Sequence, residues 1–127
     1  MGCGALGWLR VLSRWVGSSG RVVGTDIQVP MVEAARTFVE IESLGNVDVS
    51  EDDLFASALE PTSFDLVHAR FQLAPLGRFE EQVAAYRTMV KPGGVIVLED
   101  PDRSSWRFNR GAAAHRPDRA GVPGGRR

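Results

Sequence analysis

The sequence has one cysteine among its 127 residues, so the chain cannot form an internal disulfide. The absence of a possible internal disulfide is typical of proteins from a reducing compartment such as the cytoplasm. No apolar run approaches the roughly 18 residues that cross a bilayer, and the first residues lack the basic start, apolar stretch and cleavage site of a signal peptide. These absences predict a cytoplasmic protein without a membrane span.

Metal ligands and nucleophile motifs are also scarce. Two histidines and the single Cys3 give no recognised metal-ligand spacing, so no metal site is expected. Cys3 has no base beside it in the sequence, and we interpret it as a small packing residue rather than a nucleophile. Neither a G-x-S-x-G motif nor a phosphate loop ending in Gly-Lys-Ser/Thr is present, which argues against α/β-hydrolases and P-loop enzymes.

Positive charge is scarce in most of the chain. Residues 1–102 contain eight basic and fifteen acidic side chains, whereas residues 103–127 contain seven arginines and a single acid, Asp118. Binding of nucleic acid needs clustered positive charge, so we expect no nucleic-acid partner. A basic nucleic-acid-binding arm at 110–127 is the alternative, and the lack of aromatic residues among its arginines disfavours it.

The regular apolar pattern stops after Asp102. Residues 110–127 are mostly Arg, Ala, Gly and Pro, without the apolar spacing that offsets the entropy cost of ordering a chain. The predicted organisation is therefore a partial domain over residues 1–109, followed by a disordered tail over residues 110–127.

Strand and helix patterns alternate up to residue 100. Helices are expected at 5–16, 30–41 and 79–90, and strands at 22–26, 47–49, 64–69 and 95–98. The second helix is expected to bury Met31, Ala35, Phe38 and Ile41, and residues 91–94, Lys-Pro-Gly-Gly, to form a turn. Such alternation predicts an α/β fold, a Rossmann-like doubly wound and mostly parallel sheet.

Glycines open the chain in the pattern G-x-G-x-x-G, from Gly2 to Gly7, directly before a helical segment. Such glycines allow a sharp turn and a close approach to a ligand, and the helix start offers free N–H groups. Asp26 follows a strand nineteen residues later, where a carboxylate can accept both hydroxyl protons of a ribose. A glycine-rich chain start and a helix-capping aspartate are the structural alternatives, and a nicotinamide-dependent dehydrogenase would share both features.

Four later segments follow the glycine loop in a characteristic order. They are Val23–Ile27 followed by Met31, Asp53-Leu54 twelve residues before Asp65, Ser63–Val67, and Val90–Gly94. With the glycine loop, these segments resemble the class I S-adenosylmethionine-dependent methyltransferases over about residues 2–109. The resemblance implies S-adenosylmethionine as cofactor and transfer of its methyl group to an oxygen, nitrogen or carbon atom.

The resemblance also implies which residues contact the cofactor. The backbone of the glycine loop, at Gly2, Cys3 and Gly4, would border its methionine part. Asp26 would bind the ribose, and the apolar residue that follows, Ile27, would pack on the adenine.

Three further residues complete the adenine side of the expected site. Met31 belongs to the same family segment as Asp26 and Ile27. Asp53 would accept a hydrogen bond from the adenine amino group, while the Leu54 amide faces a ring nitrogen. The alternative for Asp53 is a solvated acidic loop, because two further acids precede it.

The strand ending at Ala69 and Arg70 supplies the remaining candidates, since ligands bind at the carboxyl edge of open α/β sheets. Ala69 lies at this edge, and Arg70 can pair with the cofactor carboxylate or with an acidic substrate. A surface salt bridge is the alternative for Arg70. His68 is the candidate general base, and a structural histidine is its alternative.

Parts of the family pattern are absent from the sequence. Family members begin with an apolar strand directly before the glycine loop, and here only Met1 precedes Gly2. The helix and two strands that follow the strand ending at Glu99 are also absent. We therefore expect an incomplete fold, truncated at both ends, and a frameshift or misplaced stop near Arg110 is the hypothesis for its terminus.

Three functions follow from these patterns. The first is methyl transfer to a small-molecule acceptor, with no nucleic acid and no membrane as partner. The second is a non-catalytic or degenerate fragment that holds a nucleoside cofactor, or a degenerate fragment with no ligand. The third is a NAD-dependent oxidoreductase, which Asp53 and the segments 64–65 and 92–94 disfavour.

Overall fold

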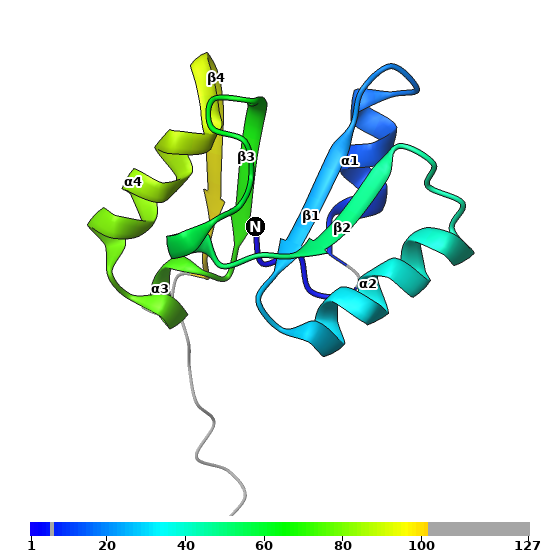
Figure 1. Ribbon diagram of the computed structural model, residues 1–127, viewed down its shortest axis with the longest axis horizontal. Coiled ribbons are helices and arrows are strands. Elements are labelled where there is room, and N and C mark those ends of the chain that lie inside the picture. Colours follow the sequence, from blue (N-terminus) through cyan, green and yellow to red (C-terminus); the bar gives the residue numbers. More distant parts are fainter. Residues whose placement is uncertain (6, 102–127) are drawn as a thin grey trace, which may run out of the picture.

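A computed structural model describes residues 1–5 and 7–101. The elements in chain order are α1 (Leu9–Val16), β1 (Val22–Asp26), α2 (Val29–Ile41), β2 (Val47–Glu51), a short 3-10 helix η1 (Leu54–Ala56), β3 (Phe64–Arg70), α3 (Leu73–Leu76), α4 (Phe79–Met89) and β4 (Val90–Glu99). Figure 1 shows this alternation of helices and strands. The predicted domain end at 109 and the tail at 110–127 lie outside the described residues.

The four strands form two parallel pairs rather than one sheet. β1 pairs with β2, from Val22 opposite Val47 to Asp26 opposite Glu51. β3 pairs with β4, and no strand pairing joins β1 to β3 in the described part of the chain. In each pair the strand that comes first in the chain, β1 or β3, lies near the middle of the molecule, and the next strand lies outside it (Figure 1). This strand order is the doubly wound arrangement that the sequence predicts. The α/β class and the parallel strands are thus confirmed.

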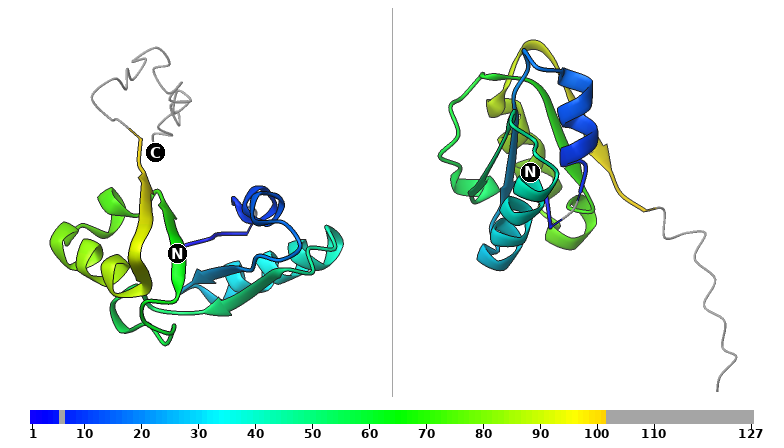
Figure 2. Two further views of the ribbon diagram at one scale, coloured as in Figure 1. Left: turned by 90° about the horizontal axis from the view of Figure 1, so that it is seen from above. Right: turned by 90° about the vertical axis from the view of Figure 1, so that its right-hand side faces the viewer.

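Each strand pair has its own apolar core. Leu9 of α1 packs with Val22, Ala35 and Val47 around the first pair. The side-chain amide of Asn46 donates to the Ser13 carbonyl at 3.1 Å and so fixes the end of α1 to the loop before β2. Figure 2 shows α1 and α2 beside the first pair and α4 beside the second.

The second core is built around a buried tyrosine. Tyr86 is fully buried, and it belongs to one cluster with the buried side chains of Leu54, Val67, Ala69 and Met89. Its hydroxyl donates to Gln72 Oε1 at 3.0 Å and also contacts the buried Gln82 Oε1 at 3.3 Å. A buried phenol of this kind needs such partners, because an unpaired hydroxyl in an apolar core is costly. The interaction therefore ties α4 to the loop that follows β3.

The buried face of α2 differs from the prediction. Ala35 is fully buried and Phe38 is half-buried, as expected, but Met31 is 37% exposed and Ile41 75% exposed. Val32, at 2% exposure, takes the buried position near the helix start. The prediction is therefore right in the middle of the helix, where Ala35 packs with Val22 and Val47 of the strands, and wrong at its two ends, where Met31 and Ile41 are exposed.

The predicted turn at 91–94 is part of β4. The strand starts at Val90 opposite Phe64, and the pairing then jumps to Val95 opposite Leu66. This register shift places the Lys-Pro-Gly-Gly residues in an irregular stretch of the strand, where Gly93 takes a left-handed φ of 80°. The glycines do mark a local irregularity, but β4 pairs with β3 both before and after it.

We predict that Tyr86 makes the protein sensitive to alkaline pH. Burial, with a smaller contribution from the Asp100 carboxylate, raises the pKa of Tyr86 from 10.0 to about 12. The stabilisation from the neutral phenol is complete below pH 10 and is lost as pH rises through about 12. By pH 11.5 this loss amounts to roughly 2 kcal/mol.

Urea unfolding of the unaltered chain and of Tyr86→Phe at pH 8 and pH 11.5 measures this loss. At pH 8 the variant should be less stable by about 1 kcal/mol, since its hydroxyl hydrogen bonds are gone. At pH 11.5 the difference should vanish or reverse. A difference that stays constant across this range contradicts the assignment.

Candidate functional site

The glycine loop crosses the carboxyl end of β1. Gly2 and Gly4 both have a left-handed φ of 56°, which glycine adopts without strain. Between them, the Cys3 amide donates to the Thr25 carbonyl at 2.8 Å. The loop also packs closely on the strand, because a Cβ on Gly24 would meet Leu9 and the Cys3 side chain. These contacts fix the loop on the strand that ends in Asp26.

Asp26 joins this loop to the start of α2. One carboxylate oxygen accepts from the Gly4 amide at 3.0 Å, and the other accepts from the Gln28 amide, also at 3.0 Å. A carboxylate has about four acceptor positions, so two backbone donors leave room for two more. Asp26 is half-buried, which keeps those positions accessible from the sheet edge.

Apolar side chains are exposed directly beside Asp26. Ile27 is 60% exposed, Val29 is 50% exposed and Met31 is 37% exposed. Single exposed apolar residues are ordinary, but three around one acid at a strand end form an uncovered apolar surface. Ile27 and Met31, two of the residues that the sequence predicts for the site, therefore have exposed apolar surface close to Asp26 in the chain.

The end of β2 lies at the same edge of the first sheet. The Asp52 amide donates to the Asp26 carbonyl at 3.1 Å, which brings the acidic segment beside the end of β1. Asp53 is half-buried, and one of its oxygens accepts from the Phe55 amide at 2.9 Å as the cap of η1. Leu54 is only 7% exposed and belongs to the second core. Asp26 and Asp53 thus follow adjacent strands at one edge.

Asp52 is a buried acid next to Asp53 that is not among the predicted site residues. It accepts a hydrogen bond from Ser57 Oγ at 2.6 Å and another from the Ala58 amide at 2.8 Å. These bonds shape the loop that presents Asp53. Neighbouring acids look alike in a sequence, so only the fold distinguishes the buried one from the accessible one.

The ends of β3 and β4 carry a second group of charges. The ring of His68 contacts Glu99 through Nε2 at 2.8 Å and lies 5.2 Å from the Trp8 ring, centre to centre. Arg70 lies 3.7 Å from the same carboxylate and stacks on Phe71. Ala69 is buried in the second core. Glu99 was not a candidate, because a partner 31 residues away leaves no local sequence signal.

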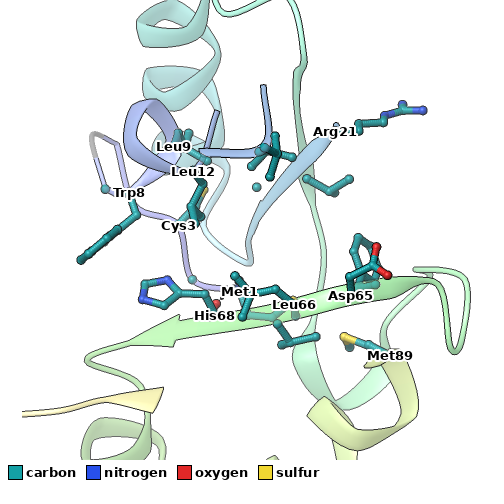
Figure 3. A pocket seen from close by; sticks show the side chains of 18 of the residues that line it. Met1, Cys3, Trp8, Leu9, Leu12, Arg21, Asp65, Leu66, His68 and Met89 are labelled. Atoms are coloured by element: carbon teal, nitrogen blue, oxygen red, sulfur yellow. Dashed lines mark hydrogen bonds between the residues drawn. The ribbon is translucent and has the colours of Figure 1, made fainter. Parts of the chain in front are cut away.

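A cavity of about 770 Å³ lies between the two strand pairs. Figure 3 shows side chains that line it, including Cys3, Leu66 and His68. Of the predicted site residues, the cavity contacts Gly2, Cys3, Gly4, His68 and Arg70, but not Asp26, Ile27, Met31, Asp53, Leu54 or Ala69. The predicted adenine and ribose residues therefore lie outside this cavity.

Burial changes the chemistry of Cys3 at the cavity wall. Loss of hydration, with a smaller contribution from the Asp26 carboxylate, raises the pKa of the Cys3 thiol above its ordinary value. A raised pKa keeps the thiol protonated at neutral pH, and the thiolate is the reactive form of cysteine. Its environment therefore agrees with the packing role that the sequence predicts.

Comparison with known proteins decides the family. A family model described as a methyltransferase domain matches residues 1–94. The chain belongs to the methyltransferase domain family. This finding confirms the resemblance to class I methyltransferases, whose cofactor is S-adenosylmethionine.

The chain is also similar to individual curated proteins, one of them a named methyltransferase. A demethylmenaquinone methyltransferase of Bacillus cereus is 30% identical over 110 residues, which are 86% of this chain and 46% of that protein. An uncharacterised 37.1 kDa protein in transposon TN4556 of Streptomyces fradiae is 34% identical over 105 residues, 83% of this chain and 30% of that protein.

A solved structure shares the fold. The crystal structure of a SAM dependent methyltransferase from Aquifex aeolicus superposes with a TM-score of 0.72 at 27% identity. The match covers 76% of this methyltransferase-domain chain and 52% of that chain. The chain thus spans less than half the length of the two curated relatives and about half of this structure.

Neither a metal site nor a membrane segment is found in the described residues. No group of three or more His, Cys, Asp or Glu side chains lies close enough together in residues 1–5 and 7–101 to hold a metal ion. No helix within this part of the chain has the length and apolar character needed to cross a membrane.

We predict that the glycine loop tolerates a Cβ poorly at Gly2. The left-handed φ costs an alanine about 1 kcal/mol, and the added carbon would overlap the Gln72 side chain that accepts from Tyr86. Gly2→Ala should therefore lose about 1–3 kcal/mol of stability in urea unfolding.

Two matched variants separate these causes. Gly4→Ala has the same φ and no neighbour within 4 Å, so its loss should be about 1 kcal/mol from backbone strain alone. Gly45→Ala, which is exposed and has neither strain nor neighbours, should change stability by less than about 0.5 kcal/mol. Equal effects at all three positions would refute the assigned loop geometry.

Proposed function

We propose that this chain binds S-adenosylmethionine at the carboxyl edge of β1 and β2 and serves methyl transfer to a small molecule. The supporting observation is the contact of Asp26 with the Gly4 amide at 3.0 Å. This contact brings the Asp26 carboxylate and the glycine loop together, next to exposed apolar residues, and so supports a ribose-binding role for Asp26. The family assignment supports the same cofactor.

The residues present fit the chemical parts of this cofactor. Asp26 has acceptor capacity left for two ribose hydroxyl groups after its two backbone bonds. Ile27 and Met31 offer an uncovered apolar surface of the kind that an adenine ring would bury. The left-handed Gly2 and Gly4 let the backbone lie close to the amino-acid part of the cofactor.

Asp53 and Arg70 complete the proposed set of contacts. Asp53 uses one oxygen for the Phe55 amide, and the other is available to an adenine amino group. Arg70 has a 44% exposed side chain at the end of β3, where its guanidinium can meet a carboxylate. The Leu54 side chain is occupied in the core, so only its backbone would take part.

When bound, S-adenosylmethionine supplies an electrophilic methyl group on its sulfur. The task of the chain is to hold the donor in line with the acceptor atom and to exclude water. For an acceptor of high pKa a base is also required, and His68 remains our candidate for that role. Its contact with Glu99 orients the ring, and the same contact is what a structural histidine would make.

A quinol is the first acceptor to test. The relatives that match this chain include demethylmenaquinone methyltransferases, and their name indicates an aromatic quinone-type substrate. We propose the same chemical class for the complete protein to which this fold belongs. The phenolic oxygens and ring carbons of a quinol are nucleophiles of the kind that a sulfonium methyl group alkylates.

We predict that Ile27→Ala weakens S-adenosylmethionine binding about tenfold. The substitution removes apolar contact with the adenine. Because Ile27 is 60% exposed without a ligand, it should leave the stability of the free protein nearly unchanged. Isothermal titration of the whole chain with S-adenosylmethionine measures the affinity.

Ile41→Ala is the matched control. Ile41 is also exposed, at 75%, but lies at the opposite end of α2, so its removal should not affect the affinity. Equal losses in both variants contradict the adenine position. Absence of saturable binding to the unaltered chain supports the degenerate-fragment alternative, and preference for NAD supports the oxidoreductase.

A further inference from the structure

Three polar side chains meet on one face of the second strand pair. His68 and Arg70 are two residues apart in β3, so their side chains project from the same face of the strand. Arg70 lies opposite Glu99 of β4, and His68 lies opposite Val97. One carboxylate therefore reaches both side chains, with Glu99 Oε1 2.8 Å from His68 Nε2 and Glu99 Oε2 3.7 Å from Arg70 Nε.

The contact with Glu99 decides which nitrogen of His68 carries the proton. A neutral imidazole has one N–H and one bare nitrogen, and an ionised carboxylate can only accept hydrogen bonds. At 2.8 Å the contact has the length of a hydrogen bond, so the proton belongs on Nε2. Nδ1 is then the bare nitrogen, and its lone pair is the basic site of the ring.

The second ring nitrogen has no partner within residues 1–5 and 7–101. In this part of the chain the hydrogen bond of the His68 ring is the one at Nε2. The side chain is 13% exposed and lines the cavity between the two strand pairs, so a molecule held in this cavity would contact the ring. A histidine with a purely structural role commonly bonds through both nitrogens, because buried polar groups are paired.

Aromatic packing limits the remaining freedom of the ring. The ring centres of His68 and Trp8 are 5.2 Å apart, with their planes inclined by 55°, and Trp8 meets Trp15 edge to face at 5.5 Å. Inclined rings with centres about 4.5–7 Å apart are a favourable arrangement. Figure 3 shows Trp8 and His68 close to each other at one side of the cavity. Glu99 and Trp8 together therefore hold the imidazole in one orientation.

The carboxylate acts on the position of the ring more than on the stability of the fold. The side chains of Arg70 and Glu99 are 44% and 37% exposed, and ion pairs with this exposure contribute little to the free energy of unfolding. Replacement of Glu99 by its amide should therefore leave the chain folded and change mainly the state of His68.

We propose that Glu99 is a positioning residue that keeps the proton of His68 on Nε2 and leaves Nδ1 to accept a proton during methyl transfer. The inference rests on the proposed function for its reaction. The acceptor oxygen forms a bond to the methyl carbon, and the bond between methyl and sulfur breaks with its electron pair left on sulfur. The proton of the acceptor hydroxyl passes to Nδ1, and the Glu99 carboxylate stabilises the resulting imidazolium.

Nitrogen-15 NMR of the whole chain measures the position of the proton. The sequence has two histidines, so a His115→Asn background leaves only the ring signals of His68. At pH 8, above the ordinary titration range of an imidazole, Nε2 should be protonated and Nδ1 bare. In Glu99→Gln the Nε2 proton should exchange with water at least about tenfold faster, because a hydrogen bond to a charged acceptor is stronger than one to an amide.

Glu42→Gln is the matched control. Glu42 pairs with Arg10 at 3.3 Å, and its side chain is 29% exposed, so the same substitution removes a carboxylate of similar exposure far along the chain from His68. Both ring nitrogens of His68 and the exchange rate of the Nε2 proton should remain as in the unaltered chain.

Methyl transfer from labelled S-adenosylmethionine to hydroquinone, a simple quinol, tests the consequence for the reaction. His68→Asn should lower kcat by about 100-fold or more, and Glu99→Gln by at least about tenfold, because the base is removed or wrongly protonated. The KM for S-adenosylmethionine should stay within about twofold in both variants, since neither side chain is proposed to contact the cofactor. Glu42→Gln should leave kcat unchanged.

The contrary results are distinct. A proton on Nδ1 in the unaltered chain, or equal Nε2 exchange in Glu99→Gln and Glu42→Gln, overturns the positioning role. Equal kcat in the unaltered chain and in His68→Asn overturns the base role. If the unaltered chain transfers no methyl group, the methyl-transfer proposal fails for this quinol and the base role fails with it, while the NMR result still decides the positioning role. If Glu99→Gln is unfolded by circular dichroism, the proton position in the unaltered chain decides alone.

Discussion

The carboxylate of Asp26 is the contact on which the site depends. It holds the Gly4 amide on one oxygen and the Gln28 amide on the other, so it fixes both the glycine loop and the start of α2 to the end of β1. Charge-assisted bonds to backbone N–H groups are among the stronger ones in proteins. Ile27 lies between these two contacts, where the chain passes from the end of β1 to the start of α2, and its side chain remains exposed.

A second constraint is the separation of the sheet into two pairs. Each pair has its own core, around Ala35 in the first and Tyr86 in the second, and few contacts join the two. The glycine loop is the main link, because Met1 and Cys3 reach to opposite edges. Its position therefore couples the edge that carries Asp26 to the edge that carries His68. This coupling makes the loop a structural element as well as part of the site.

The sequence predicted the elements well, because alternating apolar periods and glycine-rich breaks are local signals. It was wrong about the two ends of α2, where Met31 and Ile41 are exposed rather than buried. Helical periodicity alone does not say which apolar residue of each turn packs against the sheet. Glu99 beside His68 and the buried Asp52 were missed, because both depend on contacts that only the folded chain creates. The division of the sheet into two pairs agrees with the incomplete fold that the sequence predicts from the absent strand before the glycine loop.

Amide chemical shifts in a titration with S-adenosylmethionine test the central claim most directly. If the cofactor binds at the Asp26 edge, the amides of Gly4, Ile27 and Gln28 shift saturably and together, while that of Ile41 at the far end of α2 does not. Shifts confined to cavity-lining residues such as Leu12 and Leu66, or no saturable change at Gly4 and Gln28, would contradict the account.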